Sequence, residues 1–275
     1  MPHTPGRAHD PGSSDCHQRA DLFRAPGSWI WHSVAVVRPR SGSDDSDDSL
    51  LALFGAISAR DHSGVAQRLD QVPGLVTLPL RVGASRQNPR PYFLDRIGHY
   101  LYAGDTALHV AAAANDRGQA ESLVERGAAV RAHNRRGAEP LHYAADGGPG
   151  AHSNAQRELI TFLIDAGADP NALDKSGVAP LHRAVRDRCA SGVSALIDKG
   201  ANPLLLNKSG LTPLHLAVQN TGKSHSGSDA AKQEQYRVIV FLLDHGASPN
   251  DVDAKGKTVA DTAISEWIRE LLNSY

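Results

Sequence analysis

Four segments of this 275-residue chain repeat the same nine-residue phrase, and this repetition constrains the fold more than any other feature. Each segment opens on Gly, continues to a Leu-His pair and closes on Ala followed by Ala or Val. The segments are residues 104–112, 137–145, 177–185 and 210–218, with a degraded fifth copy at 256–263. A chain that repeats one unit at nearly fixed intervals folds as a stack of similar units, so we expect a repeat array.

The spacing of the phrase shows where individual units are enlarged. The first and third intervals between opening glycines are equal, whereas the second and fourth are longer; the glycines are Gly104, Gly137, Gly177, Gly210 and Gly256. A second phrase, Leu-x-x-x-Gly-Ala, recurs out of phase with the first. Its Gly follows the Leu of the first phrase at one fixed distance in units one and three, but at greater distances in units two and four. The extra residues therefore fall inside these two units, as polar insertions at 146–153 and 221–233.

Each phrase predicts a short helix with recognisable ends. The first helix is expected to start at a capping Thr, whose hydroxyl accepts from a backbone N–H group, with Pro at its first position. The Leu of the first phrase is expected in the core, and its Ala allows close helix approach. The Gly of the second phrase suits the left-handed conformation that ends a helix. The residues concerned are Thr106, Thr212 and Thr258, Pro140, Pro180 and Pro213, Leu108, Leu141, Leu181 and Leu214, Ala111, Ala144, Ala184 and Ala217, and Gly127, Gly167, Gly200 and Gly246.

A period of about 33 residues carrying Thr-Pro-Leu-His resembles the ankyrin repeat. The resemblance is clear over residues 104–263 and reaches about 50–275 with capping units included. It implies an all-α repeat solenoid in which helix–turn–helix units are joined by short β-hairpin loops. Glu139 and Ala179 depart from the pattern by replacing the capping Thr, Ala107 replaces the Pro, and Ala129-Val130 replaces Asp-Pro. Each departure should weaken one cap by about 1 kcal/mol.

The domain organisation follows from composition and phase. We expect a disordered tail with an acidic linker at 1–48, an N-terminal capping helix pair at 49–78 and an irregular aromatic-rich insertion at 79–103. Four repeats should occupy 104–136, 137–176, 177–209 and 210–255, and C-terminal capping helices 256–275. We interpret the insertion as a hairpin packed on the first repeats, with a partner-docking patch as the alternative; its aromatic residues are Tyr92, Phe93, Tyr100 and Tyr102. The closing helix should carry one apolar stripe of Ile264, Trp267, Ile268, Leu271 and Leu272.

No arrangement of residues in the sequence predicts catalysis, a metal site or a cofactor. The resemblance implies that the recurring histidines are structural, with rings bonded to backbone or to the capping Thr. Successive copies stand one repeat apart, too far to share an ion at bonds of about 2 Å. Cys189 lacks the surroundings of a nucleophile, and glycine motifs for phosphate or dinucleotide binding are absent. We therefore expect that the chain is not an enzyme. The recurring histidines are His109, His142, His182 and His215.

The resemblance implies protein–protein binding through a concave groove formed by hairpin tips and first helices. The candidate positions are His133, Arg135, Arg136 and Asp146 in repeat two, Leu173, Lys175, Arg186 and Asp187 in repeat three, and Leu206, Lys208, Gln219 and Asn220 in repeat four. Leu173 and Leu206 are the predicted apolar anchors, and the charges should orient the partner. We expect a scaffold that binds an unidentified protein.

Charge and hydropathy argue against other classes of partner. The net charge of −1 and the pI near 6.9 give no general attraction to nucleic acid. The basic hairpin tip around Arg135 has no interleaved aromatic residues in the sequence. No apolar stretch is long enough for a membrane span, and residues 1–28 do not resemble a secretion signal. We expect a cytoplasmic monomer that binds neither nucleic acid nor membrane. The alternative is a secreted ankyrin effector acting on host or competitor proteins.

Overall fold

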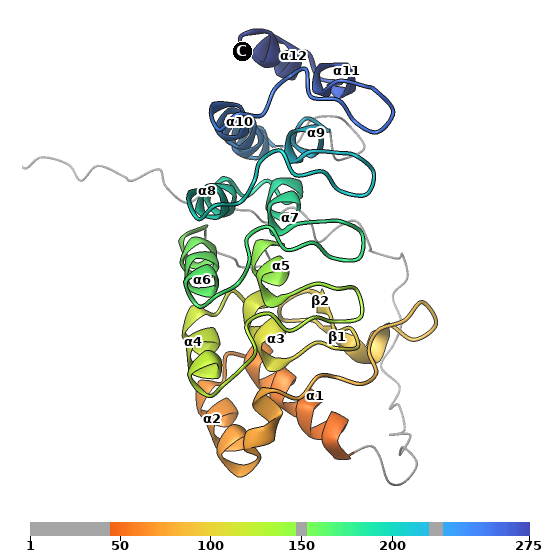
Figure 1. The fold of residues 1–275 in the computed structure, drawn as a ribbon. Helices are drawn as coiled ribbons and strands as arrows, with labels where there is room; N and C mark the ends of the chain where they lie inside the picture. The colour runs from red at the N-terminus through yellow and green to blue at the C-terminus, as the bar shows by residue number, and fades with distance from the viewer. Residues whose placement is uncertain (1–44, 147–152, 220–227) are drawn as a thin grey trace, which may run out of the picture.

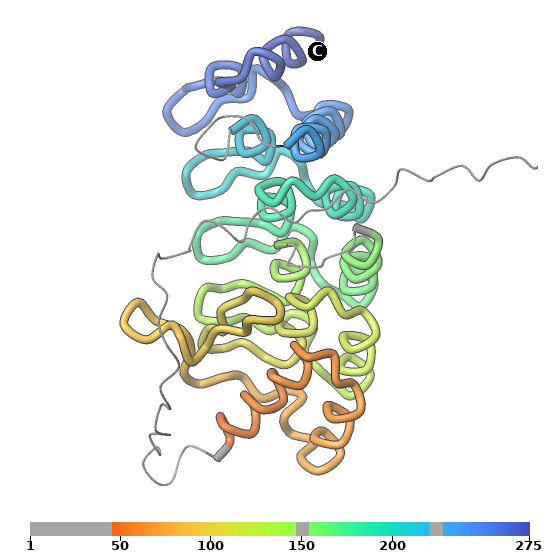
Figure 2. The backbone as a smooth tube through the Cα atoms, turned by 180° about the vertical axis from the view of Figure 1, so that it is seen from behind, coloured from red at the N-terminus to blue at the C-terminus, as the bar shows by residue number. Residues whose placement is uncertain are grey.

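The computed structural model describes residues 45–146, 153–219 and 228–275, which form an elongated stack of helix pairs (Figure 1). The first helices of the pairs make one column beside the loops, and the second helices make a parallel column behind them (Figures 1 and 2). The first column contains α1 (Asp45–Ser58), α3 (Ala107–Ala113), α5 (Pro140–Ala145), α7 (Pro180–Arg186) and α9 (Pro213–Ala217). The second contains α2 (His62–Gln71), α4 (Arg117–Glu125), α6 (Ser153–Asp165), α8 (Ala190–Asp198) and α10 (Asp229–Asp244), and the stack closes with α11 (Val259–Thr262) and α12 (Glu266–Asn273). The predicted all-α repeat solenoid is confirmed.

The helix ends lie where the phrases place them. The Thr212 hydroxyl accepts from the His215 N–H at 3.3 Å, and the Thr258 hydroxyl accepts from the Asp261 N–H at 3.1 Å. Proline occupies the first position of α5, α7 and α9. The four glycines after the second helices have φ of +94°, +105°, +91° and +95°, the left-handed conformation that glycine adopts without strain; they are Gly127, Gly167, Gly200 and Gly246.

The core runs continuously between the two columns. The leucines of the first phrase are at most 1% exposed, and the alanines beside them are buried. The first helices α3, α5, α7 and α9 contain only five to seven residues, too few to be stable alone in water. Their stability therefore comes from packing between neighbouring repeats.

One buried histidine in each repeat joins that repeat to the next. Its Nδ1 accepts from the backbone N–H of the residue that caps the first helix, at 3.1–3.3 Å. Because Nδ1 accepts, Nε2 carries the proton and donates to a carbonyl in the following loop. These contacts measure 3.1 Å to Ala138, 3.0 Å to Val178, 3.3 Å to Leu211 and 3.5 Å to Lys257, from His109, His142, His182 and His215 respectively. The predicted structural role of these rings is confirmed.

The loops between repeats, here called fingers, form a second ladder. In three successive fingers, one backbone N–H donates to a carbonyl of the preceding loop. These bonds run from Arg135 to Ala103 at 2.7 Å, from Lys175 to Arg136 at 2.8 Å and from Lys208 to Ser176 at 3.2 Å. An Asp or Asn side chain closes each tip, as where Asp174 Oδ1 accepts from the N–H groups of Ser176 and Val178. The fingers are thus held in fixed register.

Close approach between fingers explains one glycine in each tip that has a finger after it. Gly177 has φ of +70°, and a Cβ atom there would lie 2.8 Å from the Lys208 nitrogen. A larger residue would be strained and would push the next finger away.

Two predicted boundaries are wrong. Helix α1 begins at Asp45, inside the predicted tail of residues 1–48, because aspartates are stabilised in the first turn of a helix and Asp47 also pairs with Arg81 at 3.3 Å. Ile264, predicted in the closing apolar stripe, is 58% exposed because α12 starts after it, with Ser265 as the N-cap. Ile268 and Leu272 are buried, and Trp267 and Leu271 pack against the core as predicted.

Parts of three predicted segments fall outside the described residues. These parts are residues 1–44 of the tail, 147–152 of the first insertion and 221–227 of the second. Within the described part, residues 229–233 of the second insertion belong to α10.

The insertion at 79–103 forms an ordered hairpin in place of an ordinary finger. After the short 3₁₀ helices η2 (Pro73–Val76) and η3 (Arg90–Tyr92), strands β1 (Phe93–Leu94) and β2 (His99–Tyr100) pair antiparallel. Phe93 faces Tyr100, with ring centroids 4.6 Å apart. The hairpin is tied to the stack where Leu80 exchanges backbone hydrogen bonds with Asp105 and Gly104 at 2.8 and 2.7 Å.

The buried histidines that join neighbouring repeats predict that the stack loses stability in mild acid. The pKa of His142 is lowered to about 4 because burial removes solvent from the charged ring and Arg183 repels it. Unfolded histidine titrates near pH 6.5, so the unfolded chain takes up more protons between pH 6.5 and about 4. Above pH 6.5 the ring is neutral in both the folded and the unfolded chain, so His142 causes no loss of stability. As the pH is lowered from 6.5 to about 4, the free energy of unfolding falls, by about 3 kcal/mol from His142 alone.

Urea unfolding of wild type and His142→Gln at pH 7.5, 6, 5 and 4.5 tests this prediction. The variant should be less stable at pH 7.5 by about 1–3 kcal/mol through lost hydrogen bonds, and should show a shallower dependence on pH. His133→Gln, at an exposed ring, is the matched control. Equal pH slopes in wild type and His142→Gln would contradict the assignment.

Candidate partner-binding surface

The predicted apolar anchors stand at equivalent places in successive fingers. Leu173 directly precedes Asp174, and Leu206 directly precedes Asn207, the residues that close the two tips. Their side chains are 48% and 51% exposed. Val252 precedes Asp253 in the next finger in the same way and is 54% exposed. Val252 was not predicted because the phrase that follows it is degraded, although its place before Asp253 was a usable signal.

Positive side chains accompany this apolar row. Lys175 and Lys208 each follow the tip-closing residue of their finger, and both are exposed. The finger ladder fixes the backbone that carries them. Leu173, Leu206 and Val252 with Lys175 and Lys208 are called the finger row below. Gln219 is exposed just after α9, and the predicted Asn220 lies outside the described residues.

Other predicted contact residues are engaged within the protein. Asp146, after α5, accepts from Arg183 at 2.6 Å and from Arg186 at 3.4 Å, both on α7. Arg183 is 8% exposed and also donates to Asp174 at 3.1 Å. Asp146 therefore holds neighbouring repeats together, while Arg186 stays exposed. Asp187 is half-buried, and exposed His133 lies 3.2 Å from the buried Glu139 carboxylate.

The hairpin of the insertion covers the first helices of the first two repeats. The His99 ring meets the Tyr143 ring of α5 edge-on, with centroids 4.3 Å apart, and Tyr143 is 3% exposed. Burial lowers the pKa of His99, so the ring stays neutral against α5 at neutral pH. Beneath it, the Tyr143 hydroxyl donates to the buried Asp105 carboxylate at 3.1 Å, and Asn134 Nδ2 donates to the same carboxylate at 2.9 Å. The insertion therefore contacts α5 directly.

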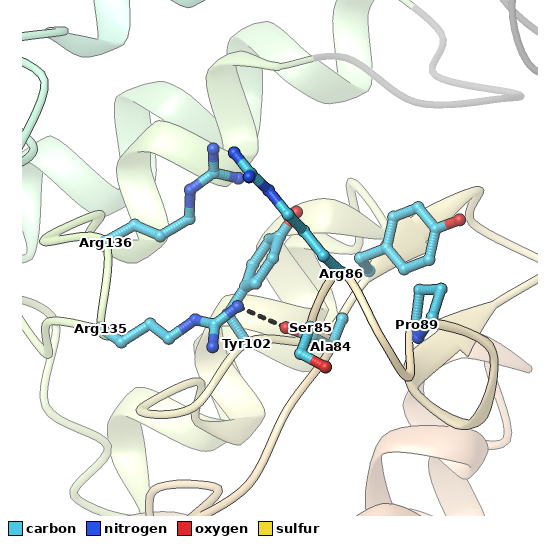
Figure 3. A pocket seen from close by; sticks show the side chains of 8 residues that line it. Ala84, Ser85, Arg86, Pro89, Tyr102, Arg135 and Arg136 are labelled. Carbon is cyan, nitrogen blue, oxygen red and sulfur yellow. Dashed lines mark hydrogen bonds between the residues drawn. The ribbon is translucent and has the colours of Figure 1, made fainter.

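Arg135 and Arg136 line a pocket of about 330 Å³ between their own finger, which precedes α5, and the insertion (Figure 3). Their guanidinium carbons lie 5.4 and 4.7 Å from the centroid of the Tyr102 ring. The Arg135 guanidinium also donates to the Ala84 carbonyl. No aromatic residue lies among the basic residues of this tip in the sequence, but the fold places Tyr102, which is distant along the chain, against Arg135 and Arg136.

Two features of other protein classes are absent from the described residues. No helix there is long and apolar enough to cross a membrane, and no group of three His, Cys, Asp or Glu is placed to hold a metal ion. Cys189 is buried, and its thiol donates to Gln156 Oε1 at 2.6 Å.

Helix pairs stacked in two columns and joined by hydrogen-bonded fingers define a repeat solenoid. The sequence matches the ankyrin repeat over residues 103–135 and 209–254, and an array of three ankyrin repeats over 149–226. This chain belongs to the ankyrin-repeat family, whose repeats are protein–protein interaction modules.

Two curated proteins share part of the array. One is the ankyrin repeat and LEM domain-containing protein 1 homolog of Caenorhabditis elegans, 40% identical over 79 residues, which cover 29% of this chain and 9% of that protein. The other is ankyrin repeat and SOCS box protein 16 of Mus musculus, 34% identical over 153 residues, which cover 52% of this chain and 31% of that protein. The chain therefore spans less than a third of the length of either relative.

The hydrogen bonds of Tyr143 and Asn134 to the Asp105 carboxylate predict a loss of stability when the Tyr143 hydroxyl is removed. Tyr143→Phe takes a donor from the buried Asp105 carboxylate, so the free energy of unfolding should fall by about 1–3 kcal/mol. Amide exchange should also quicken at Leu101, whose N–H donates to Tyr92 in the hairpin. Urea unfolding and hydrogen exchange measure both effects, with Tyr236→Phe at an exposed tyrosine as control. Unchanged exchange at Leu101 would show that the network does not hold the hairpin.

Proposed function

We propose that this chain is a non-enzymatic module that binds a partner protein through the concave face of the array, centred on the finger row. The observation that carries the proposal is the alignment of Leu173, Leu206 and Val252, each about half exposed, on three successive fingers. Large apolar side chains grouped on a surface mark interaction sites more often than isolated ones do.

The surroundings of the row suit recognition. Interfaces combine apolar anchors with a polar rim, and the exposed Lys175 and Lys208 each stand two residues after one of the two leucines. Charges at a rim mainly steer association and select partners. The partner segment that fits best carries apolar side chains flanked by acidic residues.

Rigidity supports the same proposal. The fingers are hydrogen-bonded to one another and closed by Asp or Asn side chains, so the anchors are presented on a fixed backbone. A preformed surface loses little conformational entropy on binding, which favours affinity.

The alternative of a secreted effector has no support in the fold or in the relatives, and a cytoplasmic location and a monomeric state also stay predictions. The LEM domain and SOCS box in the names of the relatives describe those proteins, of which this chain matches 9% and 31%.

Site-specific photo-crosslinking in native cells tests the finger row directly. A photoreactive amino acid at Leu206 or at Val252 should capture the same protein, whereas one at Tyr236 on α10, in the second-helix column, should not. The captured protein is then purified for binding measurements. Capture of one protein equally from all three positions would argue against the row as the interface.

The affinity of the captured partner should depend on the two leucines. Leu173→Ser with Leu206→Ser should weaken binding at least about tenfold, because buried anchors dominate interface energies. Val72→Ser with Tyr236→Ser removes two exposed apolar side chains elsewhere and is the matched control. Thermal unfolding should be nearly unchanged in both double variants. Full affinity in the leucine variant would refute the proposal.

A further inference from the structure

The pocket between the insertion and the finger of Arg135 and Arg136 is a site distinct from the finger row. Its walls are Ala84, Ser85, Arg86 and Pro89 from the insertion, Tyr100 and Tyr102 from the hairpin end, and Arg135 and Arg136 from the finger. Figure 3 shows Arg86 and Arg136 extending toward one another across the opening, with Tyr102 between the two walls. Three guanidinium groups thus converge on one cavity of about 330 Å³.

The charge in this pocket is not balanced by the protein. None of the residues that line it is acidic, and within the described residues no ion pair involves Arg86, Arg135 or Arg136. Most arginines elsewhere in the stack face a carboxylate, as Arg117 faces Glu121 at 3.0 Å and Arg157 faces Asp198 at 3.0 Å. Like charges in one cavity repel, and a bound anion removes that repulsion.

Two of the three arginines, Arg135 and Arg136, are held in place by contacts that leave their charge available. Arg135 donates to the Ala84 carbonyl, and Arg135 and Arg136 lie over the Tyr102 ring. The Tyr102 backbone N–H in turn donates to the buried Asp105 carboxylate at 2.6 Å. This bond fixes the backbone of Tyr102, and its side chain packs against the core, so an anion would meet two guanidinium groups that are partly positioned before binding.

We propose that this pocket binds the phosphoryl group of a phosphorylated segment of a partner protein. A phosphoryl group carries a charge of about −1.5 to −2 and three acceptor oxygens, which matches three guanidinium forks better than one carboxylate does. Arginine is suited to this task because its planar fork donates two parallel hydrogen bonds. The pocket is larger than a phosphoryl group, so the residue that carries it also enters, against Tyr100 and Tyr102.

The site depends on two segments that are distant in the sequence. Arg86 belongs to the insertion, whereas Arg135 and Arg136 belong to the finger before α5. The finger cations of later repeats, Lys175 and Lys208, are not among the residues that line this pocket. The proposed site therefore needs both the insertion and the finger of Arg135 and Arg136.

Titration of the full chain with short synthetic peptides tests the proposal by calorimetry and by amide chemical shifts. The probes are a phosphotyrosine peptide, a phosphoserine peptide, their unphosphorylated forms, a glutamate peptide of equal charge and a single-stranded oligonucleotide. Because these peptides carry no apolar anchors, the outcome is independent of the finger row. A phosphopeptide should bind saturably and shift the amides of Tyr102 and Arg135, while the unphosphorylated form should not.

The variants assign the binding to the pocket. Arg86→Gln and Arg136→Gln should each weaken phosphopeptide binding about tenfold, since a charge-assisted hydrogen bond is lost. The affinity of Arg136→Lys for the phosphopeptide should lie between that of the glutamine variants and that of wild type, because lysine keeps the charge but lacks the two parallel N–H donors. Arg117→Gln removes one positive charge from α4 and should bind like wild type. Thermal unfolding reports whether each variant is folded, and the amide shifts of wild type locate the site without any variant.

Each other outcome overturns the proposal. Equal binding of phosphorylated and unphosphorylated peptides, or wild-type affinity in both glutamine variants, would remove the site. Equal affinity for the glutamate peptide would make it a general acidic-peptide site. Tighter binding of the oligonucleotide, lost in the same two variants, would assign the pocket to nucleic acid.

Discussion

The stack depends on one buried imidazole in each repeat. Its Nδ1 accepts from the N–H at the start of its own first helix, and its Nε2 donates to the next finger at 3.0–3.5 Å. Helices of five to seven residues are unstable alone, and this bond links each of them to the loop that follows. Cooperativity along the array follows from such nearest-neighbour contacts. Together with the backbone hydrogen bonds between neighbouring fingers, this bond fixes the positions of the loops.

The insertion turns a nearly symmetrical array into one with two different surfaces. Its hairpin lies against α5 through His99 and Tyr143, and its neighbouring residues complete a cationic pocket with Arg135 and Arg136. Beyond it, the fingers of Leu173, Leu206 and Val252 stay exposed. A partner that used both surfaces would contact an apolar row and a charged pocket at once. Such divided recognition gives specificity, since the two requirements must be met together.

Residues whose role is local or repeated could be predicted from the sequence. The proline starts, the glycine ends and the buried leucines follow from capping rules and from a recurring phrase. Residues at the ends of the array and in unique segments could not. Asp45 begins a helix that composition suggested was a solvated linker, Ile264 lies before its helix, and Asp146 forms ion pairs with Arg183 and Arg186. None of these has a repeat partner that reveals its contacts.

The sequence by itself determined the repeat unit, the stacking order and the positions of the finger tips, because the same short-range pattern occurs several times in phase. Only the tertiary structure decided what the insertion does and which predicted surface residues are free to bind. Tyr102 meets Arg135 and Arg136, and His99 covers Tyr143, through packing between segments that are distant along the chain. Such contacts arise once in the chain and obey no period, so they depend on the three-dimensional shape into which the repeats have already folded.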